Sequence, residues 1–196
     1  LLSALAACAA GAAGAASGLP DGAVCAPGGT CPAPAPAQAD AFLPAGKMAL
    51  GANYWASHTA TEMWRKWDAK AVEEDLRVLA SNGFRLLRVF PNWADFQPIH
   101  ACYLSGGNFG KVNETRLFDS EEPLPDTPCG RAGVDERMVE RFEAFCDMAE
   151  KHGIRLIVPL LTGQMTFRNY IPPALANRNP FSDPYALMWE GRYLAC

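Results

Sequence analysis

Two junctions in the sequence decide the fold: NGFRLL at residues 82–87 and HGIRLI at residues 152–157. In each of them a glycine ends a stretch with helical spacing, and an apolar run typical of a strand begins at once. The same helix-to-strand step therefore occurs twice. Such a repeat, with nearly continuous apolar strands between amphipathic helices, indicates a parallel sheet covered by helices.

Outward from these junctions the sequence predicts three strands and three helices. The strands are the apolar runs 48–55, 84–90 and 154–161. The helices are predicted to follow Asp68, Asp135 and Asp183, because an aspartate at this position accepts hydrogen bonds from the free amides of the first turn. We therefore expect an α/β fold of about three βα units within residues 47–196. Three parallel strands leave an open edge, so the domain is expected to be incomplete.

Two N-terminal stretches are not expected to fold. Residues 1–18 are almost wholly Ala, Gly, Leu and Ser, which is typical of the end of a secretory signal. The alternative is a lipoprotein signal in which Cys8 is lipidated, and that lipid would be the chain's only membrane contact. Residues 19–46 are rich in Pro, Gly and Ala and predict an extended linker. We expect a secreted or cell-envelope protein.

The seven cysteines also fit an exported protein. A disulfide between Cys25 and Cys31 would close a small loop, and one between Cys102 and Cys129 would cross-link the long segment 92–133. Cys146 lies in a helical apolar stripe and is expected to be a buried free thiol. No Cys or His cluster has zinc spacing, so no metal is expected.

Composition and motifs exclude several classes of partner. The formal net charge is −4 and the charges are dispersed, whereas nucleic acids and anionic membranes require basic patches. No glycine-rich phosphate loop, G-x-S-x-G or H-E-x-x-H motif is present, and no cofactor is expected. The segment 92–133 has no clear period, and loops of this length in a compact domain are usually functional.

Polar and aromatic residues follow each predicted strand, where ligands bind in α/β folds. The residues selected as candidates are Asn53, Trp55 and His58 after the first strand, Arg88, Asn92 and Trp93 around the end of the second, and Gln164 after the third. Rings beside amides offer a sugar a flat apolar face and hydrogen-bond partners. Phe167 and Arg168 lie in the third cluster. Each tryptophan could instead be a core aromatic, and His58 could make a local hydrogen bond.

Arg88 is the most informative candidate, because it lies inside the apolar run LLRVF. An arginine there must either be buried with an anionic partner or sit near the end of the strand. We favour a role in the active site over a structural ion pair.

Three runs in the sequence resemble the glycoside hydrolase family 5-like enzymes, the cellulase and β-mannanase group. These runs are GANYWASHTATEMWRKWD at 51–68, DLRVLASNGFRLLRVFPNWADFQPI at 75–99 and FRNYIPPALANRNPFSDPYALMWE at 167–190. The resemblance covers roughly residues 47–195 and implies the N-terminal part of a TIM (β/α)₈ barrel. It does not specify one substrate, because segment 92–133 departs from compact members of the group.

The resemblance implies a retaining glycosidase acting on a β-linked polysaccharide or oligosaccharide such as mannan or glucan. Such an enzyme needs two carboxyl groups about 5–5.5 Å apart, one to protonate the leaving oxygen and one to attack the anomeric carbon. By resemblance both are glutamates, expected beyond Cys196. Arg88 matches the strand-two arginine that holds the nucleophile ionised. Trp55, Asn92, Trp93 and Gln164 match neighbourhoods that line the sugar cleft.

Two other interpretations stay open at this point. One is a non-catalytic carbohydrate-binding barrel that kept the cleft without the acids. The other is a different small α/β protein, such as a flavodoxin-like domain, although the sequence has no phosphate-binding glycine loop. For the leading interpretation, we expect the 196-residue chain alone to have no glycosidase activity.

Overall fold

The computed structural model describes residues 48–103, 112–116, 122–165 and 167–196, together with the side chains of 48–101, 122–165 and 167–196. The predicted signal and linker, with Cys8, Cys25 and Cys31, lie outside these residues. Within the described part, no helix has the length and apolar character needed to cross a membrane.

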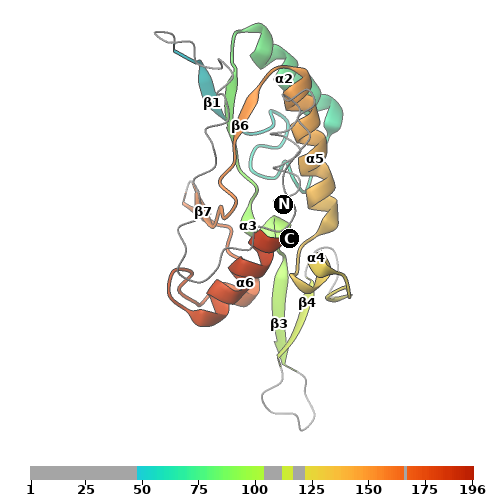
Figure 1. Ribbon diagram of the computed structural model, residues 1–196, viewed down its shortest axis with the longest axis vertical. Coiled ribbons are helices and arrows are strands. Elements are labelled where there is room, and N and C mark those ends of the chain that lie inside the picture. Colours follow the sequence, from blue (N-terminus) through green and yellow to red (C-terminus); the bar gives the residue numbers. More distant parts are fainter. Residues whose placement is uncertain (1–47, 104–111, 117–121, 166) are drawn as a thin grey trace, which may run out of the picture.

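A three-stranded parallel sheet lies in the upper part of the molecule in Figure 1. Its strands are β1 (Gly51–Tyr54), β2 (Leu86–Val89) and β6 (Arg155–Ile157), and they lie in the order β1-β2-β6. All three predicted strands are confirmed, although each is shorter than its apolar run. Among the described residues, β1 and β6 are the outer edges of this sheet.

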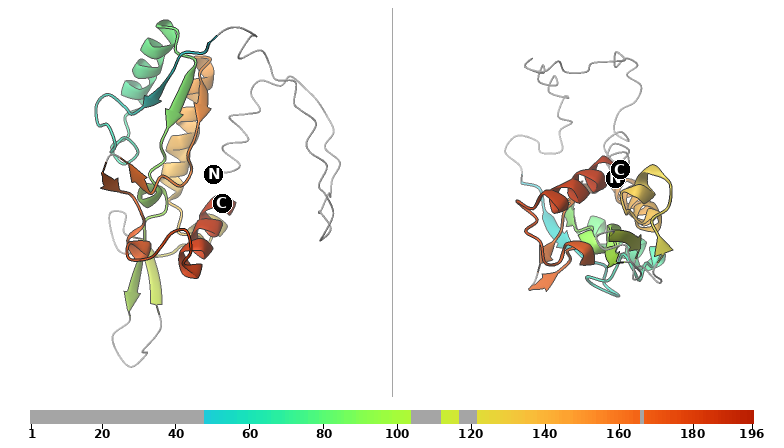
Figure 2. Two further views of the ribbon diagram at one scale, coloured as in Figure 1. Left: turned by 90° about the vertical axis from the view of Figure 1, so that its left-hand side faces the viewer. Right: turned by 90° about the horizontal axis from the view of Figure 1, so that it is seen from below.

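Two helices cover one face of the sheet: α2 (Ala69–Ser81) and α5 (Glu136–Lys151). The left panel of Figure 2 shows the strands in front of α5, with the other face of the sheet turned to the viewer. The predicted caps Asp68 and Asp135 accept hydrogen bonds from first-turn amides, as does Asp183 before α6 (Pro184–Ala195). These local signals placed every long helix correctly.

Glycines end α2 and α5, as the two junctions predict. Gly83 has φ +84° and Gly153 has φ +64°, a left-handed conformation that side chains with a Cβ disfavour. Each glycine turns the chain back so that the next strand can join the sheet.

Side chains alternate between the two faces of the sheet. Tyr54, Leu87 and Val89 are buried against the helices, whereas Asn53 and Arg88 are exposed on the opposite face. The exposed surface is called the open face below. It contains no helix among the described elements, and in a closed barrel the corresponding face points inward.

Trp64 is the centre of the core on the helical side. Its ring packs against Phe96, Phe142 and Phe145 with centroid distances of 5.3, 5.8 and 5.9 Å. Its Nε1 donates a hydrogen bond to the carbonyl oxygen of Phe90 at 2.7 Å. Trp64 therefore joins the segment after β1 to both the end of β2 and the face of α5.

The segment 92–133 is more regular than the sequence indicates. It contains α3 (Trp93–Phe96), the antiparallel strands β3 (Ile99–Tyr103), β4 (Val112–Arg116) and β5 (Glu122–Pro123), and α4 (Pro128–Arg131). β3 and β4 project from the body of the molecule in Figure 1. The expectation of an irregular segment was wrong, because these consecutive strands pair without the apolar alternation that marks a strand in the sequence.

The stretch after β6 also contains short elements that the sequence did not indicate. They are β7 (Gln164–Met165), β8 (Arg168–Asn169) and the 3₁₀ turn η1 (Pro173–Leu175). β7 and β8 pair antiparallel as a tight hairpin.

The disulfide pattern corrects two cysteine predictions. Cys129 bonds to Cys196, with a Cα–Cα distance of 5.3 Å, so the predicted pair of Cys102 and Cys129 is wrong. Cys146 is disulfide-bonded and is not the expected free thiol. Spacing along the chain could not find the partner of Cys129, because it lies 67 residues away at the end of α6.

Candidate functional site

Three chain segments meet at the C-terminal edge of the sheet, where the sequence places its candidates. The segments after β2 and β6 form a parallel bridge between Asn92 and Thr162. The amide of Trp93 donates to Thr162 O at 3.2 Å, and the amide of Ala94 donates to Tyr170 O at 2.6 Å. Asn92 Nδ2 donates to Thr61 O, in the segment after β1, at 2.8 Å. These bonds give the edge a fixed framework.

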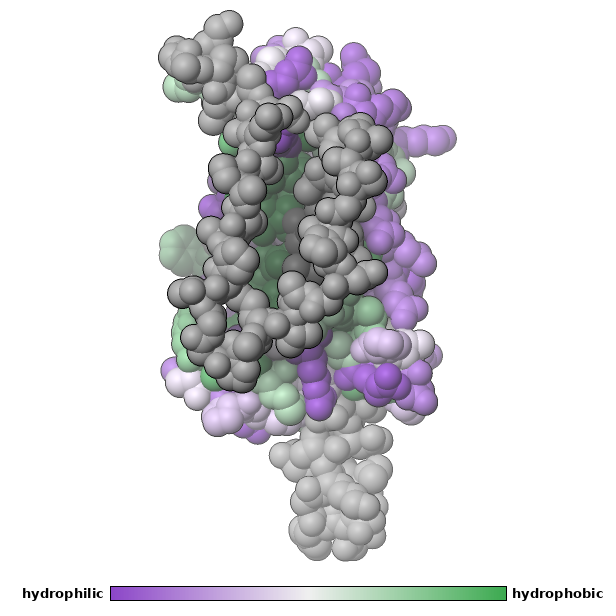
Figure 3. Space-filling model, in the orientation of Figure 1, coloured by the Kyte–Doolittle hydropathy of each residue, from purple (hydrophilic) through white to green (hydrophobic). Residues whose placement is uncertain are grey.

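Asn53 and Arg88 lie side by side on the open face at this edge. They are register partners in the β1–β2 pair, and Arg88 is paired in turn with Ile157 of β6. Partners in a parallel pair point to the same face, so the three side chains form one row across the sheet. Figure 3 shows apolar surface in the upper middle of the view, where β2 and β6 run.

Arg88 has no carboxylate partner among the described side chains. Its guanidinium carbon lies 4.9 Å from the centroid of the Phe90 ring, and the side chain is exposed. Because Arg88 is near the end of its strand and reaches solvent, it needs no buried anion. This cation can therefore act on an anionic group brought to the open face.

Trp55 also packs on Phe90. The two rings are stacked with a centroid distance of 5.1 Å and an interplanar angle of 17°. Phe90 is thus the shared support of Trp55 and Arg88, a role that our sequence analysis missed because it assigned Phe90 only to the strand. The sequence does contain a signal for this role: an aromatic residue stands directly after a strand that carries an arginine.

Asn92 holds the loop after β2 in place from within. It is fully buried, and its Nδ2 donates to Asp95 Oδ2 at 3.0 Å as well as to Thr61 O. Burial raises the pKa of Asp95, while the bond from Asn92 and the nearby Arg65 act in the opposite direction. Arg65 Nε lies 3.4 Å from Asp95 Oδ1. Asn92 is therefore part of the framework under the site rather than of its surface.

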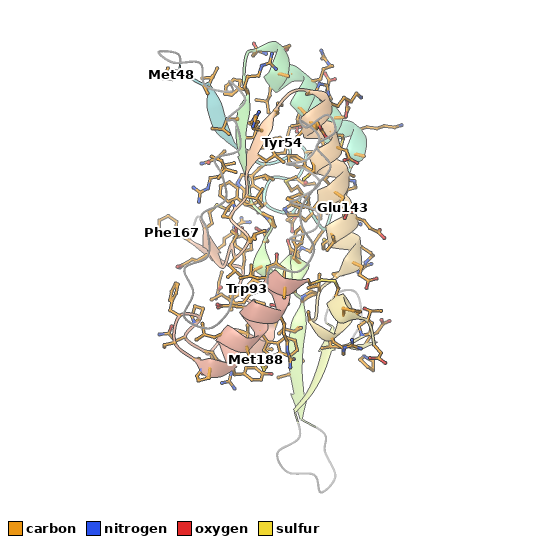
Figure 4. The ribbon with its side chains drawn as sticks, in the orientation of Figure 1. Met48, Tyr54, Trp93, Glu143, Phe167 and Met188 are labelled. Carbon is orange, nitrogen blue, oxygen red and sulfur yellow. A yellow bond between two sulfur atoms is a disulfide. The ribbon has the colours of Figure 1, made fainter. Side chains whose placement is uncertain are left out.

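Trp93 belongs to the core. Only 2% of its surface is exposed, and its Nε1 donates to Gln97 Oε1 at 2.7 Å. Gln97 Nε2 in turn donates to the carbonyl oxygens of Ala132 and Trp189. In Figure 4, Trp93 lies inside the molecule beside α6. Its ring offers no face to a sugar here, so the core alternative describes Trp93 correctly.

His58 and Gln164 are both exposed at this edge. His58 Nε2 lies 3.0 Å from Lys66 O, which is the local hydrogen bond of the alternative interpretation. Gln164 begins the β7–β8 hairpin and pairs with Asn169. The structure thus brings Asn53, Trp55, Arg88 and Gln164 to one edge of the sheet, with His58 on the loop beside them.

A cavity of about 570 Å³ lies elsewhere, between α4 and the end of α6, and Arg131 and Arg192 form part of its wall. Arg131 pairs with Asp126 at 2.6 Å, and Arg192 lies over the ring of Trp189 at 4.6 Å. None of its lining residues comes from the C-terminal edge of the sheet. No group of three potential metal-ligating side chains occurs in the part of the chain that the structure describes.

Comparison with known proteins gives matches at the level of structure. No protein-family model and no curated protein sequence matches the chain. The exo-β-1,4-mannosidase Op5Man5 from Opitutaceae bacterium strain TAV5 superposes with a TM-score of 0.55 and 26% identity, covering 75% of this chain and 21% of that one. GH5_18 from Streptomyces cattleya, solved with GlcNAc, gives 0.56 and 28%, covering 74% and 28%.

The fold is the N-terminal part of a glycoside hydrolase family 5-like barrel. GH5_18 from Bifidobacterium longum subsp. longum supports the same fold, with a TM-score of 0.55 at 20% identity. The chain spans 21–29% of the lengths of the solved structures that it matches. The likeness is one of fold, and in a closed barrel of this kind the face of the sheet opposite the helices points inward.

Proposed function

We propose that the protein is a retaining glycoside hydrolase acting on β-linked mannosides, and that the described residues supply substrate binding and the Arg88 cation. The observation that carries this proposal is the row of Asn53 and Arg88 on the open face, beside the stack of Trp55 on Phe90. Support also comes from the match to a β-1,4-mannosidase and to a Streptomyces cattleya enzyme variant solved with Manβ1-4GlcNAc, at 26% and 27% identity.

The chemistry assigns Arg88 a supporting role. A retaining mechanism needs a carboxylate nucleophile that stays ionised next to the sugar. A guanidinium within about 4–6 Å favours the charged form of a carboxylate and lowers its pKa. The strands β1, β2 and β6 carry no Asp or Glu. The nucleophile and the acid/base are therefore predicted to be residues outside these strands.

The test compares hydrolysis and binding. The product of the complete gene is assayed on β-1,4-mannotriose and on an aryl β-mannoside, alongside the 196-residue chain. We expect turnover by the complete product, and binding without turnover by the 196-residue chain. Arg88→Met should reduce kcat/KM of the complete product by about 100-fold or more, since one strong transition-state contact is worth roughly 3 kcal/mol. Failure of the complete product to hydrolyse either substrate would refute the proposal.

A non-catalytic carbohydrate-binding protein is the second candidate. The specific observation that favours it is the lack of a carboxylate on β1, β2 and β6. Mannotriose binding by the complete product without any turnover would select it. In that case Arg88→Met should change the affinity for mannotriose, and no variant should show turnover.

A further inference from the structure

Phe167 carries two unfavourable features at once. Its ring is fully exposed, and its backbone has φ +61°, a left-handed conformation that residues with a Cβ rarely adopt. Glycine would remove both features. A phenylalanine with both features is a reason to look for a use of its ring.

The ring is carried by a hairpin with defined contacts. Arg168 pairs with Met165 across the hairpin, and its Nη1 donates to Thr61 Oγ1 at 3.0 Å. The amide of Tyr170 donates to Gly163 O at 2.7 Å, which closes the base of the hairpin. The β7–β8 hairpin is thereby tied to the segment after β1, and the ring is presented from a fixed support.

The position of the hairpin places this ring beside the candidate site. β7 starts two residues after Thr162, which bridges to Asn92 at the C-terminal edge of the sheet. In Figure 4 the ring of Phe167 projects to the left, the side from which the left panel of Figure 2 shows the open face. Exposed amides flank it, from Gln164 on β7 and Asn169 on β8.

We propose that Phe167 is a stacking platform for one pyranose ring of a β-linked oligosaccharide held at the C-terminal edge of the sheet. The aliphatic C–H face of the sugar would lie on the aromatic ring, while the amide of Gln164 accepts from and donates to its hydroxyls. Asn169 Oδ1 already accepts the amide of Ile171 at 2.9 Å, so Asn169 would donate to a hydroxyl through Nδ2. Phe167 thus determines how strongly a sugar outside the reacting bond is bound. This inference rests on the proposed function and names a binding residue for it.

The experiment titrates the 196-residue chain with β-1,4-mannotriose and follows NMR chemical shifts, which report weak binding. Phe167→Ala should weaken binding about tenfold, equivalent to about 1.4 kcal/mol, and Phe167→Trp should retain it. Phe167→Gly should weaken binding equally, with an unfolding temperature no lower than that of the wild type, because glycine accepts the left-handed conformation. That combination separates loss of the ring from loss of the fold.

Phe181→Ala is the matched control. Phe181 is 89% exposed but lies just before α6, outside the hairpin, and its replacement should leave mannotriose binding unchanged. If Phe167→Ala binds like the wild type while Arg88→Met binds more weakly, the inference is wrong and the proposed function stands. If Phe167→Ala only reduces self-association, the ring is a protein contact and the inference is wrong. If the wild type binds no mannotriose, the inference is wrong, whereas the proposed function is decided by turnover of the complete product.

Discussion

The disulfide between Cys129 and Cys196 gives a prediction whose size follows from the chain length that it closes. The two cysteines are separated by 67 positions. In the chain-entropy description, a cross-link over about 67 residues lowers the entropy of the unfolded chain enough to stabilise the fold by about 4 kcal/mol at 25 °C. Cys196→Ser should therefore lower the free energy of unfolding by about this amount, which corresponds to roughly 8–16 °C in Tm.

The assay is urea unfolding followed by far-UV circular dichroism, on the wild type, on Cys129→Ser, on Cys196→Ser and on the double variant. Because both single variants break the same bond, all three variants should lose the same stability. Peptide mapping of the unreduced wild type should recover Cys129 linked to Cys196. A loss below about 1 kcal/mol, or a linkage of Cys129 to Cys102, would refute the reasoning.

Three further predictions concern the framework of the site. Burial raises the pKa of Asp95, so the folded state binds a proton on this carboxyl more tightly than the unfolded state does. The stability that this proton contributes is present in acid and is lost as pH rises through the folded pKa. Asp95→Asn should therefore have a higher Tm than the wild type at neutral pH, and the difference in Tm should disappear in acid. Trp64→Phe removes the 2.7 Å bond to Phe90 O and leaves a buried carbonyl unpaired, which should reduce the free energy of unfolding in urea by about 3 kcal/mol. Gly133→Ala should cost more stability than Gly83→Ala: both have positive φ, but an added Cβ has no neighbour within 4 Å at Gly83 and overlaps Ile99 Cγ2 at Gly133.

Each of these predictions has an outcome that contradicts it. Equal melting temperatures for Asp95→Asn and the wild type across the pH range would mean that this carboxyl titrates as it does in the unfolded chain. Retained stability in Trp64→Phe would mean that the Phe90 carbonyl finds another donor. Equal losses in the two glycine variants would show that the contact with Ile99 relaxes without cost.

Local signals in the sequence predicted the elements of the sheet and its cover. Asp68 and Asp135 cap their helices as expected, and the buried stripe of Met138, Phe142 and Phe145 faces the core. These features depend on residues within one or two helical turns. β3 and β4 are consecutive along the chain, but their sequences IHACY and VNETR show no regular apolar alternation, so no local period indicated their pairing.

The candidate site was predicted in part, for a physical reason that separates Arg88 from Trp93. Asn53 and Arg88 are register partners on neighbouring strands, so the placement of their side chains on one face follows from strand geometry. Trp93 comes after the strand, so strand alternation does not say where its ring points. A hydrogen bond to Gln97, formed in the folded chain, sets the orientation of the ring. The exposure of Phe167 likewise arises from a two-strand hairpin that composition does not show.

The outer edges of β1 and β6 have a consequence for handling the protein. Each edge strand offers backbone amides and carbonyls that find no strand partner among the described elements. Such an edge is a template on which a second molecule can add a strand of its own. Concentrated solutions of the 196-residue chain should therefore form mixed, concentration-dependent assemblies, and dilute samples are the appropriate starting point for every binding measurement proposed above.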